Sequence, residues 1–182
     1  MKYFILLTAF CVCASVLPPE PPMGVQERIV AIAQGYVGIT DDGNNKGKQM
    51  DYWNARLGLP AGSNYCASFI AHLLDSAQAS YPTVRSGVAQ HYITRSSIRA
   101  ERVLSGKLVP PGYIAVWKRG DSWMGHTEII KYSWRGKYGM TIGANTTPGP
   151  GGDQRQGRGV YVRERHIDPT AFFRLTHITP TR

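Results

Sequence analysis

The chain is short of cysteine and of acidic residues, and it has no internal repeat. Its 182 residues contain three cysteines, two of which, Cys11 and Cys13, fall within the first fifteen positions. Twelve acidic residues stand against twenty-one lysines and arginines, which gives a net charge of +9. This excess favours an anionic partner. With 42% hydrophobic residues, the chain has material for one packed domain and too little for two.

The chain also lacks an apolar segment long enough to span a bilayer. Its one apolar run, residues 3–12, follows Lys2 and precedes the small residues Ala14 and Ser15, the pattern of an export signal. We therefore predict a signal peptide at 1–15, a Pro-rich linker at 16–24 and a single domain at 25–182. The mature protein is expected to be secreted or periplasmic, without stable membrane insertion. Lipidation is less favoured, because bulky Phe10 and Val12 precede the two early cysteines.

Signal removal leaves Cys66 as the one remaining cysteine, so no internal disulfide is possible. Apolar periodicity predicts helices over 25–37 and 47–57, and a buried helix that holds Cys66, with Ser63 or Asn64 as its cap. Segments rich in β-branched and aromatic residues predict strands at 113–118, 127–132, 140–145 and 160–165. The expected fold is α+β, with N-terminal helices packed on a C-terminal antiparallel sheet.

A free cysteine is most often a buried small hydrophobe, but the position of Cys66 indicates chemistry. In the first turn of a helix, unpaired backbone N–H groups and the positive end of the helix dipole favour a thiolate. The same N–H groups can receive an oxyanion, a contribution worth about 3 kcal/mol per donor. Burial against Phe69 and Ile70 opposes ionisation, so the thiol needs a cationic partner.

Hairpin geometry points to His126 as that partner. If the turn is centred between Arg135 and Gly136, facing residues have numbers that sum to 271, and His126 stands opposite Asn145. Opposed residues lie about 5 Å apart at Cβ, close enough for an amide to orient an imidazole. Cys66, His126 and Asn145 would then form a nucleophile, base and orienter. Glu128 shares the predicted face with His126 and is the alternative orienter.

Other motifs carry less information. His72 lies about 120° around the helix from Cys66. His91, His166 and His177 have no second reactive residue at a spacing that would bring the two side chains together. The run at 41–45 lacks the ligand pattern of an EF-hand, and 43–48 lacks the spacing of a phosphate loop. No metal or cofactor is predicted. Nucleic acid is not an expected partner, because no zinc finger, RNP-like strand or basic zipper is present.

Several short motifs together resemble one family. They are Asn44-Asn45-Lys46-Gly47 ahead of Tyr52, Gly58-Leu59-Pro60, Tyr65-Cys66-Ala67-Ser68-Phe69, Ile114-Ala115-Val116-Trp117, Gly125-His126 and Gly143-Ala144-Asn145-Thr146. Their order over residues 25–165 resembles the CHAP family of cysteine- and histidine-dependent amidohydrolases and peptidases, within the NlpC-type papain-like group.

The resemblance implies a papain-like fold and a cysteine amidase or peptidase that cleaves bacterial peptidoglycan, either at the muramoyl-L-alanine amide or within the stem peptide or cross-bridge. It implies Cys66 as nucleophile, His126 as base and Asn145 as third member. Two positions depart from the family pattern. Tyr113 stands where an Asp is frequent, and Gly143 stands where some members carry a Glu.

The positive charge suits a wall polymer that carries carboxylates and phosphates. Tyr65, Trp117 and Trp123 are candidate substrate-binding residues that stack on sugar faces, although core or rim packing explains aromatic residues equally well. The protein is expected to act as a monomer. A non-catalytic wall-binding module, or an acyltransferase or amidase with a non-wall substrate, remains open because fold and triad do not fix the substrate.

Overall fold

The structure is a computed structural model, and it describes residues 23–81, 84–149, 157–167 and 173–176. The predicted signal peptide, 1–15, and most of the predicted linker lie outside these ranges. Four α-helices and one short 3-10 helix are present in the described part. They are α1 (Val25–Gly35), α2 (Lys48–Ala55), α3 (Cys66–Ser76), η1 (Ala89–Tyr92) and α4 (Ala100–Leu104).

Six strands form one antiparallel sheet in the order β1-β6-β2-β3-β4-β5. Their bounds are β1 (Ile98–Arg99), β2 (Ile114–Lys118), β3 (Gly125–Ile130), β4 (Tyr138–Thr146), β5 (Gly159–His166) and β6 (Phe173–Thr176). The helices precede most of the sheet in the chain, and the longest helices pack on it. The predicted α+β arrangement of N-terminal helices on a C-terminal antiparallel sheet is confirmed.

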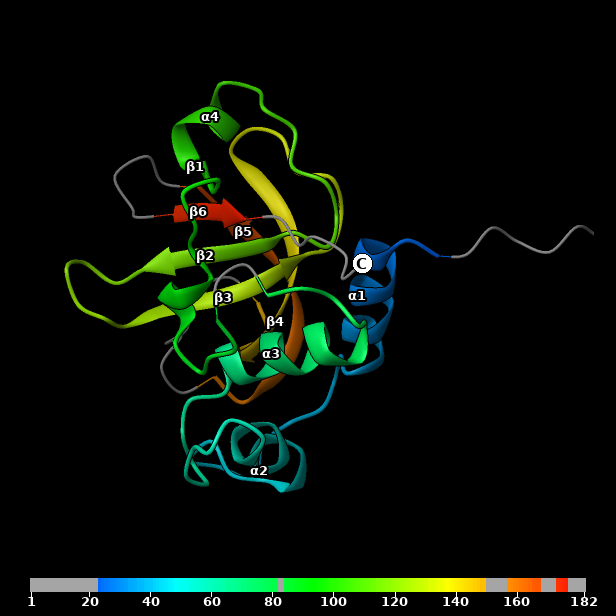
Figure 1. Cartoon of the computed structure of the whole chain (residues 1–182), viewed down its shortest axis with the longest axis vertical. Helices are drawn as coiled ribbons and strands as arrows, with labels where there is room; N and C mark the ends of the chain where they lie inside the picture. Colours follow the sequence, from blue (N-terminus) through cyan, green and yellow to red (C-terminus); the bar gives the residue numbers. More distant parts are fainter. Residues whose placement is uncertain (1–22, 82–83, 150–156, 168–172, 177–182) are drawn as a thin grey trace, which may run out of the picture.

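The main core lies between the sheet and the two helices α1 and α3, which lie against it in Figure 1. Ile29 of α1 and Phe69 of α3 are fully buried there, as are Ile114 and Ile129 from the two central strands. Apolar residues at helical spacing thus meet apolar residues at strand spacing. This contact holds the first turn of α3 close to β3 and β4.

A second cluster covers the opposite face of the sheet. Ala115 and Ile130, the strand neighbours of Ile114 and Ile129, pack there with Val103 of α4. Since successive strand residues point to opposite faces, the sheet is buried on both sides. His126 and Glu128 have the same alternation as Ile130, so polar residues continue this second face toward the start of β3.

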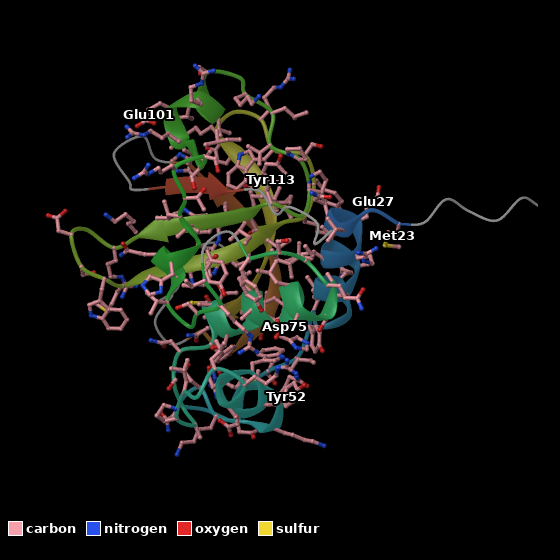
Figure 2. All side chains as sticks on the ribbon, in the orientation of Figure 1. Met23, Glu27, Tyr52, Asp75, Glu101 and Tyr113 are labelled. Atoms are coloured by element: carbon pink, nitrogen blue, oxygen red, sulfur yellow. The ribbon has the colours of Figure 1, made fainter. Side chains whose placement is uncertain are left out.

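The helix α2 packs on α3 through aromatic side chains. Trp53 is buried and contacts the rings of Tyr36, Phe69 and His72. Asp75 of α3, labelled in Figure 2, accepts hydrogen bonds from Arg56 and Arg85 at 3.0 and 2.8 Å. These contacts fix α3 from the side that faces away from the sheet.

The main differences from the predicted elements concern short segments and one cap. The elements α4, β1 and β6 have no counterpart in the prediction, and β1 has only two residues. The expected cap of α3 by Ser63 or Asn64 is wrong, because Tyr65 is the N-cap and makes no side-chain capping bond. No helix in the described ranges is long and apolar enough to cross a membrane.

Candidate active site

Cys66 is the first residue of α3, as the sequence predicts. Cys66 is 7% exposed and lines a cavity of about 120 Å³, here called the nucleophile cavity. Asn64, Trp123 and Asn145 line the same cavity. The first backbone N–H groups of a helix have no intrahelical partner, so those of the first turn of α3, where Cys66 lies, are available to a ligand.

His126 lies near the start of β3, and its ring interacts with both Glu128 and Cys66. Its Nε2 atom is 2.9 Å from Oε1 of Glu128, which leaves Nδ1 for the thiol. Burial alone would lower the pKa of His126, but its interactions with Cys66 and Glu128 raise the pKa to about 9. The imidazole is therefore protonated at neutral pH, and a protonated imidazole beside a cysteine favours the thiolate.

Glu128 is fully buried beneath His126 and is held by three groups. Arg165 of β5 binds both of its carboxylate oxygens, through Nε at 2.8 Å and through Nη2. Thr141 of β4 donates its hydroxyl to Oε2. Burial would raise the pKa of Glu128, but the hydrogen bonds from Arg165 and His126 hold it well below its usual range. A permanent negative charge thus sits behind the imidazole.

Gly143 creates the space that this carboxylate occupies. The pairs Glu128↔Gly143, Ile129↔Ile142 and Ile130↔Thr141 all follow the predicted register, in which facing numbers sum to 271. A Cβ atom on Gly143 would lie 2.2 Å from Oε1 of Glu128, far inside contact distance. The absence of a side chain at Gly143 is therefore a requirement of the Glu128 position.

The predicted contact between Asn145 and His126 is wrong. The β3–β4 register ends at Glu128 and Gly143, and β4 shifts register against β5 between Ala144 and Thr146. Asn145 sits in this irregularity with a positive φ of 54°. Its Nδ2 atom donates to Oδ1 of Asn64 at 3.0 Å. Asn145 thus lines the nucleophile cavity, while Glu128, the alternative considered from the sequence, orients the imidazole.

The three aromatic residues predicted to bind substrate have different positions. Trp123 is 73% exposed at the edge of the nucleophile cavity and is free to stack on a ligand. Trp117 is partly buried beside His126, with its ring centroid 6.0 Å from the imidazole. Tyr65 is completely buried, and its hydroxyl donates to Asp41 at 2.9 Å. The prediction that Tyr65 contacts substrate is wrong, because the side chain fixes the start of α3 to the 41–45 turn.

Sequence reasoning missed three polar residues of the site. Arg165 is remote in the chain, and no local motif connects it with Glu128. Asn64 was assigned to a helix cap, but its Oδ1 accepts from the amides of Asn45 and Asn145. Arg119, at the β2–β3 turn, lines the nucleophile cavity and a neighbouring one. The sequence contains no comparable signal for these three residues. For the carboxylate that orients His126 it does, because strand alternation places Glu128 on the same face as His126.

The remaining histidines of the described ranges interact with residues other than Cys66. Nε2 of His72 is 2.7 Å from the Tyr36 hydroxyl, and Nδ1 of His91 is 2.8 Å from the Ser86 hydroxyl. His166 packs on Tyr138, and His177 lies outside the described residues. Within those residues, no group of three or more His, Cys, Asp or Glu side chains is arranged to hold a metal ion.

Two comparisons with known proteins gave no match. No family model matches the chain, and no curated protein sequence matches it.

Proposed function

We propose that this protein is a cysteine amidase or peptidase of papain-like type that hydrolyses an amide bond in bacterial peptidoglycan. The observation that carries the proposal is the order of three groups. A thiol at the start of α3 interacts with an imidazole, and the imidazole is hydrogen-bonded to a buried carboxylate. Nucleophile, base and orienter are the parts that thiol hydrolysis requires.

In the proposed reaction, the Cys66 thiolate attacks the amide carbonyl carbon. The backbone N–H groups of the first turn of α3 stabilise the oxyanion that forms. Protonated His126 donates its proton to the leaving nitrogen, so the C–N bond breaks and a thioester remains on Cys66. His126, now neutral, takes a proton from water, whose oxygen attacks the thioester and releases the acid and the thiolate.

Glu128 has the part of the orienter in this scheme, and it accounts for one departure from the CHAP pattern. Some family members carry a Glu at the position of Gly143. Here Gly143 faces Glu128, and the two side chains would occupy the same space. A carboxylate from either strand reaches this position, so the glycine is consistent with an intact site in which the facing strand supplies the acid.

Three features support a wall polymer as the substrate. The sequence resembles a family that acts on peptidoglycan, the amino terminus has the pattern of an export signal, and the net charge of +9 suits a polymer with carboxylates. Trp123 adds an exposed aromatic face at the rim of the nucleophile cavity. Sugar rings and peptide groups both stack on such a surface.

Digestion of purified peptidoglycan, followed by mass spectrometry of the soluble fragments, tests the proposal. Fragments with a newly freed muramic lactyl group identify a muramoyl-L-alanine amidase. Shortened stems or opened cross-bridges with new amino termini identify an endopeptidase. If no new amine appears in peptidoglycan of several cross-link types, the wall substrate is refuted.

A further inference from the structure

A second cavity opens on the His126 side of the site, and we call it the basic cavity. It has a volume of about 200 Å³ and is separate from the nucleophile cavity, although Arg119 and Gly125 line both. Its lining residues are Trp117, Lys118, Arg119, Gly125, His126 and Arg165. Three permanent cations and no acid therefore surround a space beside the group that protonates the leaving nitrogen.

The three cations are not equivalent. Arg165 is committed to an ion pair with Glu128. Arg119 takes part in none of the ion pairs between described residues, and the residue is partly exposed and lines both cavities. An arginine binds a carboxylate through two parallel hydrogen bonds, a geometry that a lysine does not reproduce. Arg119 is thus the side chain of the basic cavity best suited to an anionic ligand.

The opposite side of the site has a different chemical character. A larger cavity of about 660 Å³ adjoins the nucleophile cavity there through Asn64, Gly87, Val88 and Trp123. Its other polar groups include Asn45 and Ser63, and its one charged lining residue, Arg85, is already paired with Asp75. We call it the amide-lined cavity. Its lining suits neutral sugar or peptide groups, whereas the basic cavity suits an anion.

From this asymmetry we infer that the basic cavity binds a free carboxylate on the amine-side fragment of the substrate. The inference rests on the proposed function and assigns a direction to the substrate. His126 delivers its proton to the leaving nitrogen, so the fragment that departs as an amine extends past His126 into the basic cavity. The neutral acyl fragment lies in the amide-lined cavity, and Arg119 binds the carboxylate.

The test compares two soluble muropeptide substrates that share an acyl fragment and differ in one group. One carries a free carboxylate on the amine-side fragment, and the other carries the carboxamide. The wild-type protein is expected to prefer the carboxylate at least about tenfold in kcat/KM, since hydrogen bonds to charged groups are the stronger class. Arg119→Gln should reduce the preference to near unity, mainly through KM, and Arg119→Lys should retain part of it.

Lys107→Gln is the matched control, because it removes one positive charge from an exposed residue after α4. It should keep the full preference. Hydrolysis of both substrates at equal rates by the wild type would overturn the inference and leave the proposed function standing. A preference that persists in Arg119→Gln would overturn the assignment of the carboxylate to Arg119.

Binding provides a readout that does not need turnover. Cys66→Ala is titrated with a dipeptide amine that ends in a free carboxylate and with its carboxamide, and tryptophan fluorescence reports occupancy because Trp117 lines the basic cavity. The carboxylate should bind at least about tenfold more tightly, and Arg119→Gln should remove the difference. Equal affinities refute the inference. Failure to hydrolyse any wall amide, with this binding difference intact, refutes the proposed function alone.

Discussion

The charge of Glu128 should control the protonation of His126, and Glu128→Gln removes that charge with almost no change in size. In the wild type the pKa of His126 is about 9, against 6.5 for an ordinary histidine. At 1.36 kcal/mol per pH unit, this difference favours the protonated ring by roughly 3 kcal/mol. The variant keeps the Arg165 guanidinium, whose Nη2 atom is 3.5 Å from Nε2 of His126. Without the charge of Glu128, burial and this cation should lower the pKa of His126 below its wild-type value, although the interaction with Cys66 remains.

The assay is the rate of Cys66 alkylation by iodoacetamide, followed by mass spectrometry of the peptide that contains Cys66. Each pH unit by which the pKa of His126 falls moves the equilibrium from thiolate and imidazolium toward thiol and neutral imidazole tenfold. We therefore expect alkylation of Glu128→Gln at pH 6.5 to be at least about tenfold slower than in the wild type.

The pH dependence of stability gives an independent check on the same variant. A raised pKa stabilises the fold below pH 6.5, and this contribution is lost as the pH rises through about 9. The melting temperature of the wild type should therefore fall over this interval more steeply than that of Glu128→Gln. The control is Glu164→Gln, an exposed neighbour on β5. Equal alkylation of Glu128→Gln and the wild type at pH 6.5 would refute the role of the carboxylate.

Three further substitutions test single contacts of the site. Gly143→Ala should displace the Glu128 carboxylate, because the added Cβ lies 2.2 Å from Oε1. Alkylation of Cys66 at pH 6.5 should then be at least about tenfold slower. An unchanged rate would show that alkylation does not need the carboxylate at this position. Tyr65→Phe should lower the free energy of unfolding by about 1–3 kcal/mol in urea titration without changing KM, and a raised KM would restore Tyr65 as a substrate contact. Asn145→Ala should lower kcat by releasing Asn64 yet leave the pH profile of alkylation unchanged, and a shifted profile would mean that the amide does act on His126.

The sequence predicted the parts of the fold that follow a local period. Apolar spacing located α1, α2 and α3, and it placed Cys66 in the first turn of its helix. Turn position and strand alternation predicted the β3–β4 register and the shared face of His126 and Glu128. These features depend on a few neighbouring residues, so the backbone geometry of helices and strands is sufficient to derive them.

The features that could not be predicted depend on tertiary contacts. The register ends before Asn145, because the β4–β5 irregularity and a positive φ turn its side chain toward Asn64. Arg165 reaches Glu128 only once β5 is paired with β4. Tyr65 has the sequence context of an exposed aromatic residue next to the nucleophile, yet its hydroxyl finds a buried partner in Asp41. None of these contacts has a signature in local spacing.

The central claim is that the sulfur of Cys66 breaks an amide bond in the bacterial wall. The most direct measurement compares the rates at which the wild type and Cys66→Ala release soluble fragments from purified peptidoglycan, with equal melting temperatures as evidence that both are folded. Loss of a covalent nucleophile should reduce the rate by about 1,000-fold or more. Release by the alanine variant at the wild-type rate would contradict the account.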